Sequence, residues 1–198
     1  MINDKGINSI IEISDSCQLA NGVQIQIFGS NNALYISENT KIIGGILEIR
    51  GHNSILKIGS DCTINAHIRC RSNQSKIEIG DNTTIGFAQI STHEEGDITL
   101  GKDCMLSGDI TMDVSDMHSI LDLKTQASIN PPASIDIGDH VWIAHGAAIA
   151  KGVTIGSGSV IGAKSFVNKD VEKNSIYAGV PAKKIKEDVC WDRRILPL

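Results

Sequence analysis

The segment IDIGDHVWIAHGAAIAKGVTIGSGSVIGAKSF, residues 135–166, has an aliphatic side chain at every sixth position. The file of aliphatic residues consists of Ile137, Ile143, Ile149, Ile155, Ile161 and, just beyond the segment, Val167. A helix repeats about every 3.6 residues and a half-buried strand every two, so neither element explains this spacing. It is the spacing of a hexapeptide repeat, in which each unit forms one short side of a triangular coil.

The repeat also predicts how the coils stack. Three hexapeptides make a coil of about 18 residues, and successive coils lie as parallel strands about 4.8 Å apart. The aliphatic residue points into the triangle, and a small residue usually follows it where the chain approaches a corner. We therefore predict an all-β protein, folded as a parallel β-helix.

A looser form of the pattern extends upstream. Five tetrads, SDSC, SENT, GSDC, GDNT and GKDC, lie 21 to 23 residues apart and end at Cys17, Thr40, Cys62, Thr83 and Cys104. Each tetrad is expected to mark one coil with a few extra residues at a corner. Because cysteine and threonine alternate in one file, these cysteines are predicted to be small interior residues rather than nucleophiles.

Two segments depart from the repeat. Residues 113–134 lack the spacing, contain Pro131 and Pro132, and are predicted to leave the coil as a functional loop. The repeat ends after Asp170, which predicts a β-helix over 1–170 and a C-terminal tail over 171–198. Three apolar residues separated by charges predict a short capping helix in the tail, namely Ile185, Val189 and Ile195.

Composition narrows the class of protein. The 198 residues carry a net charge of −5, and the scattered basic side chains argue against a nucleic-acid-binding face. No segment approaches the roughly 18 apolar residues of a membrane span, and the N-terminus lacks the pattern of a signal peptide. We expect a cytoplasmic protein. The five cysteines show no CxxC spacing, which favours neither a disulfide framework nor a zinc site.

The chain resembles the hexapeptide-repeat acyltransferases, and is most similar to the O-acetyltransferases that modify capsular and other surface polysaccharides, including sialic acid polymers. The resemblance covers nearly the whole chain. It rests on SDMHSI, IGDHVWIA, GVTIGSGSVIGA and NSIYAGVPAKKIK. It implies a left-handed winding, acetyl-CoA as the acetyl donor and no metal. It also implies a homotrimer whose active sites lie between subunits, with a carbohydrate acceptor.

The resemblance also implies catalytic residues. His118 matches the family's catalytic histidine, and an imidazole is suited to deprotonate an acceptor hydroxyl as that hydroxyl attacks the thioester directly. A carboxylate commonly orients such a base. Asp113, Asp116 and Asp122 lie close enough in sequence to do so, and we favour Asp116.

Two further residues are assigned to catalysis and acceptor binding. Trp142 matches a tryptophan that the family places in the cleft, where its ring suits a sugar and its N–H can meet the thioester sulfur or the oxyanion. Maltose and galactoside acetyltransferases carry an asparagine in the preceding coil. The matching run here is Phe87, Ala88, Gln89, so Gln89 is the candidate substitute.

The family's cofactor cleft is carried over to the last coils and the tail. Small residues permit close approach of the pantetheine arm, while cations meet the phosphates. The cofactor-binding candidates are Ala144, His145, Gly162, Ala163, Lys169, Pro181, Lys183 and Lys184. His145 departs from the small residue that the family often has there.

Other functions remain open from the sequence. The acceptor could be a small sugar or a nucleotide-linked sugar rather than a polymer. A γ-type carbonic anhydrase shares the fold and binds zinc through histidines, for which His118, His140 and His145 would be the candidates. A non-enzymatic solenoid used as a binding module is the third alternative.

Overall fold

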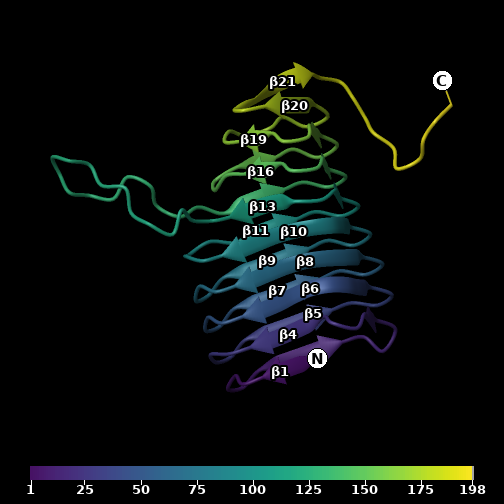
Figure 1. The fold of residues 1–198 in the computed structure, drawn as a ribbon, viewed down its shortest axis with the longest axis vertical. Helices are drawn as coiled ribbons and strands as arrows, with labels where there is room; N and C mark the ends of the chain where they lie inside the picture. The colour runs from purple at the N-terminus through teal and green to yellow at the C-terminus, as the bar shows by residue number, and fades with distance from the viewer. Residues whose placement is uncertain (198) are drawn as a thin grey trace.

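Isoleucine, leucine and valine occupy most inward positions of the chain, and they form one continuous core. The coils that carry them stack one above another (Figure 1). The computed structural model describes residues 1–197, so the last residue of the predicted tail lies outside it. Every pairing between coils is parallel, as in the register Leu56↔Ile77. The predicted all-β parallel β-helix is confirmed.

The strands line three faces of a triangular solenoid. Face 1 consists of β3 (Gln18–Leu19), the first parts of β6 (Lys41–Ile49), β8 (Thr63–Cys70) and β10 (Thr84–Thr92), then β12 (Met105–Leu106), β15 (Trp142–Ile143), β18 (Val160–Ile161) and β20 (Ile176–Gly179). Face 2 consists of β1 (Ile2–Asp4), β4 (Gln24–Ile27), the second parts of β6, β8 and β10, then β13 (Ile110–Asp113), β16 (Ala148–Ile149) and β19 (Phe166–Val167).

Face 3 consists of β2 (Ile10–Ile13), β5 (Ala33–Ile36), β7 (Ile55–Ile58), β9 (Lys76–Ile79), β11 (Ile98–Leu100), β14 (Ile135–Ile137) and β17 (Thr154–Ile155). The three faces meet at three corners. We call the corner between faces 3 and 1 corner A, that between faces 1 and 2 corner B, and that between faces 2 and 3 corner C.

The corners require backbone in the left-handed region, which asparagine, aspartate and glycine tolerate best. Corner A carries positive φ angles at Asn39, Asp61, Asn82, Asp103, His140, Gly158 and Asn174. The equivalent residues are Asp109, Gly146 and Lys164 at corner B, and Asn31, Asn53, Gln74 and Gly152 at corner C. The polar residues between the predicted strands therefore turn the chain rather than line the core.

The predicted file of cysteine and threonine is built into the interior. Thr40 donates a hydrogen bond to the carbonyl of Gly59 (2.6 Å) and accepts one from the N–H of Cys62 (3.1 Å). Cys104 continues the file two coils further on, and burial raises the pKa of its thiol to about 11. A thiol in this state stays protonated at neutral pH, which fits an interior packing role.

A long loop leaves the solenoid at corner C, between the end of β13 at Asp113 and the start of β14 at Ile135. It projects well beyond the coils on the left of Figure 1. An isolated antiparallel bridge between Leu121 and Ser128 closes it into a narrow hairpin.

The predicted capping helix is wrong. Ile185 lies instead in β21 (Ala182–Lys186), which pairs antiparallel with β20 at the end of the solenoid. The last coil presents unpaired backbone groups along its edge, and a strand satisfies them where a helix would not. Val189 and Ile195 follow in an extended segment on the side of the solenoid away from the loop (Figure 1). Residues 1–197 contain no helix able to cross a membrane.

Candidate functional site

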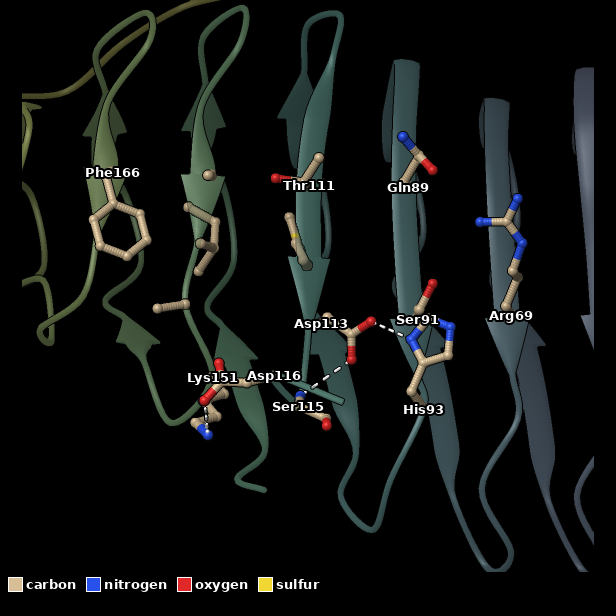
Figure 2. Close-up of a pocket in the computed structure, with 14 residues that line it drawn as sticks. Arg69, Gln89, Ser91, His93, Thr111, Asp113, Ser115, Asp116, Lys151 and Phe166 are labelled. Atoms are coloured by element: carbon tan, nitrogen blue, oxygen red, sulfur yellow. Dashed lines mark hydrogen bonds and ion pairs between the residues drawn. The ribbon is translucent and has the colours of Figure 1, made fainter. Parts of the chain in front are cut away.

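A polar pocket of about 380 Å³ lies on face 2, beside the base of the loop (Figure 2). It is formed by outward-facing residues of β8, β10 and β13, which the coil register places side by side. Ser91 lies between Arg69 and Asp113, and Gln89, the predicted acceptor-binding residue, is paired with Thr111. Gln89 therefore lines the pocket together with Thr111.

An imidazole and a carboxylate are paired inside this pocket. The Nδ1 atom of His93 is hydrogen-bonded to a carboxylate oxygen of Asp113, and Arg71 donates to Nε2 of the same ring at 3.2 Å. Since an arginine can only donate, Nε2 is the acceptor and the proton resides on Nδ1. The other oxygen of Asp113 accepts the backbone N–H of Ser115 (3.1 Å), where the loop begins.

Neither His93 nor Arg69 was identified from the sequence. The signal that reveals them is the length of one coil, because Arg69, Ser91 and Asp113 lie 22 residues apart, as do Arg71, His93 and Ser115. Writing the chain in rows of that length places these polar residues in two columns.

The base of the loop is held by Asp116. Its carboxylate accepts hydrogen bonds from Lys151 (2.5 Å) and from the side-chain amide of Asn130 (2.8 Å). These two bonds, that of Lys151 first, lower the pKa of Asp116. Asn130 also donates to the backbone carbonyl of His118 at 2.9 Å. Asp116 thus fixes the chain that carries the predicted base.

The ring of His118 is exposed and makes no hydrogen bond to any residue of the described chain. Each of the three carboxylates predicted to orient it has other partners. Asp113 is bonded to His93, Asp116 anchors the loop, and Asp122 accepts backbone N–H groups of its own turn. Within one chain, the imidazole is presented to the surroundings without an orienting carboxylate.

Trp142 lies on face 1, where its indole points outward beside the inward Ile143. It is flanked by Met105 on the coil before and Val160 on the coil after. Its Nε1 atom is buried and has no hydrogen-bond partner among residues 1–197. The ring of Trp191, from the tail, lies against it, with ring centroids 6.1 Å apart.

The tail is docked at corner A. The indole of Trp191 stacks on the ring of His140, with centroids 4.1 Å apart and planes 7° from parallel. Its Nε1 donates to the carbonyl of His140 (2.8 Å). The ring of His140 is hydrogen-bonded through Nδ1 to Asp103 (2.7 Å), which also accepts from Arg193 (2.8 Å). Trp191 was not anticipated from the sequence, because nothing in its neighbourhood repeats.

Four of the predicted cofactor-binding residues come together at corner B. Ala144 and His145 precede that corner on one coil, and Gly162 and Ala163 precede it on the next, with Lys164 N–H bonded to the carbonyl of His145 (2.8 Å). The turn that contains Pro181 lies above them, between β20 and β21. A Cβ atom on Gly162 would lie 2.7 Å from that of Ala178 in this hairpin, so the position requires glycine.

The three predicted phosphate-binding lysines differ in their surroundings. Lys183 is exposed on β21, in register with Ala178 of the hairpin. Lys184 is bonded to Glu172 (2.7 Å) and Glu187 (3.0 Å), which raise its pKa and engage its charge. Lys169 follows β19 at corner C and so lies apart from the other two.

The predicted site residues thus form two groups in one chain. His118, Asp116 and Gln89 lie on the loop and face 2. Trp142 lies on face 1, which in a triangular coil is opposite corner C, where the loop begins. A site that needs both His118 and Trp142 cannot be assembled from one copy in this conformation.

The described part of the chain holds no group of three or more histidine, cysteine, aspartate or glutamate side chains arranged as metal ligands. Of the histidines considered for zinc, His140 is bonded to Asp103 at corner A, and His145 lies 3.4 Å from Asp109 at corner B.

Comparison with known proteins identifies the family. The family model for bacterial transferase hexapeptide repeats, with six repeats, matches residues 134–169. Over 196 residues the chain is 35% identical to a polysialic acid O-acetyltransferase of Neisseria meningitidis, covering 98% of this chain and 91% of that protein. It is 41% identical over 119 residues to a polysialic acid O-acetyltransferase of Escherichia coli O1:K1 / APEC, covering 60% and 39%.

Solved structures lead to the same family as the sequence relatives. The crystal structure of the polysialic acid O-acetyltransferase OatWY matches with a TM-score of 0.93 and 33% identity, covering 99% of this chain and 93% of that one. The polySia-specific acetyltransferase NeuO matches with a TM-score of 0.88 and 33% identity, covering 98% and 82%. These matches confirm the predicted left-handed β-helix and the prediction of an acyltransferase. The chain belongs to the hexapeptide-repeat O-acetyltransferase family that includes the polysialic acid O-acetyltransferases.

Proposed function

We propose that the protein transfers an acetyl group from acetyl-CoA to a hydroxyl group of an acidic surface polysaccharide, with a sialic acid polymer as the first candidate. The relatives that carry that activity in their names match almost the whole chain. A polar pocket beside an anchored loop suits a sugar ring, because hydroxyl groups need several hydrogen-bond partners when they leave water.

His118 is the general base in this proposal. Its imidazole takes the proton of the acceptor hydroxyl while the hydroxyl oxygen bonds to the acetyl carbonyl carbon. The tetrahedral oxyanion that results collapses by breaking the carbon–sulfur bond, and the sulfur leaves as a thiolate that takes up a proton. The products are the acetyl ester and free CoA, with no covalent enzyme intermediate.

Trp142 is the hydrogen-bond donor to the reacting group. Its N–H lacks a partner within residues 1–197, so a negatively charged oxygen or the thioester sulfur would satisfy a donor that is otherwise buried and unpaired. The ring of Trp191 lies against that of Trp142, so a ligand that approaches this side of Trp142 would meet the tail segment. Asp116 acts as a positioning residue, since it holds Asn130 and through it the backbone of His118.

Acetyl-CoA supplies the activated acetyl group. The residues at corner B fit its narrow arm, because Ala144 is small and half-buried and Ala163 is small and exposed, while Gly162 packs against Ala178 of the β20–β21 hairpin. Lys183 is the exposed cation best placed in that hairpin to meet a phosphate, while Lys184 already faces two carboxylates. His145, at the same corner, is a candidate for contact with the pantetheine arm of acetyl-CoA.

The active unit in this proposal is a homotrimer with shared sites. The separation of His118 from Trp142 in one chain supports it, because a neighbouring copy can bring the loop of one subunit to face 1 of another. We expect the enzyme to act in the cytoplasm, where acetyl-CoA is available.

The observation that carries the proposal is the exposed imidazole on an anchored loop beside the pocket, in a chain that superposes on a polysialic acid O-acetyltransferase over 99% of its length. The test measures thiol release from acetyl-CoA with a sialic acid polymer, with monomeric and nucleotide-linked sialic acids as competing acceptors. His118→Ala is expected to lower turnover by at least about 10²-fold. His52→Ala, at an exposed histidine in a turn of corner C, is the matched control and should stay active. Near-normal turnover of the His118 variant would exclude it as the base.

A further inference from the structure

Three arginines lie near one another on face 2 and corner C, and two of them are neutralised. Arg71 and Arg50 form ion pairs with Glu48, at 2.7 Å and 2.8 Å, and that carboxylate is only 4% exposed. Arg69 differs, because no ion pair joins it to a carboxylate anywhere in residues 1–197. Its positive charge is therefore available to a ligand.

Arg69 is nevertheless held in place. Its guanidinium donates a hydrogen bond to Nδ1 of His67 at 3.1 Å, and the ring of His67 packs edge-on against Phe87, with centroids 5.4 Å apart. Burial, and then the charge of Arg69, lower the pKa of His67. The imidazole is therefore a neutral acceptor near pH 7, which orients the guanidinium without cancelling its charge.

The oriented guanidinium belongs to the pocket. Arg69 is in register with Ser91, and both line the pocket together with Gln89 (Figure 2). Along this row Arg69 is also in register with Glu48, whose carboxylate is bonded to Arg71 and Arg50. The carboxylate of Asp113, on the other side of Ser91, is bonded to His93. A ligand in the pocket thus meets the guanidinium of Arg69, which pairs with no carboxylate of residues 1–197, together with an amide and a hydroxyl group.

We propose that Arg69 sets the acceptor specificity of the enzyme by binding the carboxylate of an acidic sugar in this pocket. A guanidinium presents two parallel N–H donors that match the two oxygens of a carboxylate. Gln89 and Ser91 are placed to hydrogen-bond the hydroxyl groups of the same sugar. The inference rests on the proposed function and names the group on the acceptor that is recognised.

The experiment compares two acceptors: a sialic acid polymer, and the same polymer with its carboxylates reduced to alcohols. Wild-type enzyme is expected to prefer the acidic polymer in kcat/KM by at least about 10-fold. Arg69→Gln should lose that preference, mainly through a higher KM for the acidic polymer, and should leave kcat/KM for the reduced polymer nearly unchanged. Arg69→Lys, which keeps the charge but not the fork, should lie between.

Arg50→Gln is the matched control, since it removes the same charge from a site where the charge is already neutralised. Arg50→Gln should keep the wild-type preference for the acidic polymer. If it loses as much of that preference as Arg69→Gln does, the preference comes from general electrostatic attraction between protein and polymer, and the assignment to Arg69 is overturned. The assignment would also be overturned if Arg69→Gln, with the melting temperature and CoA binding of the wild type, kept the wild-type preference for the acidic polymer. Wild-type enzyme that acetylates neither polymer would instead refute the proposed function, and this inference with it.

Discussion

Two inactive variants should restore activity to each other when their subunits are mixed. His118→Ala removes the proposed base on the loop, and Trp142→Ala removes the proposed hydrogen-bond donor on face 1. Because the loop begins at the corner opposite face 1, each site in a trimer would take His118 from one subunit and Trp142 from the next. A site is intact only where a loop from a Trp142→Ala subunit meets face 1 of a His118→Ala subunit.

The expected yield follows from counting. In randomly assembled trimers from equal amounts of the two variants, each of the two required neighbours is present with probability one half. About one quarter of the sites are then intact, so activity should reach about 25% of the wild type, against about 1% or less for either variant alone. The assay is thiol release from acetyl-CoA by the whole co-expressed population, and two affinity tags are used on a separate sample only to verify that mixed assemblies form.

A second mixture provides the control. Wild-type subunits mixed equally with the double variant should also give about 25% if sites are shared, because both neighbours must be wild type, but about 50% if each site lies in one chain. Mixed trimers of the two single variants that show only the average of the parent activities would refute the shared site, and a value near 50% in the control would do the same.

Three further outcomes concern stability. Ile64→Ala, at a fully buried core position, should lower the free energy of unfolding by about 2–5 kcal/mol in chemical denaturation. Gly51→Ala should destabilise the fold strongly in the same assay, because its Cβ atom would lie 1.8 Å from the carbonyl oxygen of Ser72 on the next coil. Burial opposes the ionisation of Glu48, but hydrogen bonds from Arg71 and Arg50 outweigh it and lower its pKa. The ionised carboxylate therefore stabilises the fold fully above its ordinary pKa of about 4.3, and this stabilisation is lost as the pH falls through the lower folded value. Thermal unfolding between neutral and acid pH should show the gap between wild type and Glu48→Gln shrinking on acidification, and a constant gap would contradict this.

The fold could be predicted because its determinants repeat. Ile137, Ile143 and Ile149 each specify the inside of a coil through local spacing alone, and the file from Thr40 to Cys104 does so for the longer coils. The tail could not be predicted in this way. Its strand around Ile185 forms because the last coil leaves an unpaired edge, and that demand comes from the fold and not from neighbouring residues.

Candidate site residues could be named from the sequence only where the chain matches the motifs of known relatives. The loop histidine and Trp142 follow motifs, and how they act is still a proposal. Arg69 and His93 follow no motif, because outward positions of a solenoid are free to vary and become neighbours only through coil length. The proposed trimer gives the separation of His118 from Trp142 a physical reason, since a site shared by copies would not be encoded as proximity in one chain.

The sequence contains two tryptophans, and the fold places them together, one on face 1 and the other on the docked tail, with ring centroids 6.1 Å apart. Indoles this close couple electronically, and the coupling produces a paired circular dichroism signal that disappears when either ring moves away. The unlabelled protein therefore carries an optical reporter of tail position. A ligand that moves Trp191 away from Trp142 would abolish this signal, and the loss of the signal would time that movement.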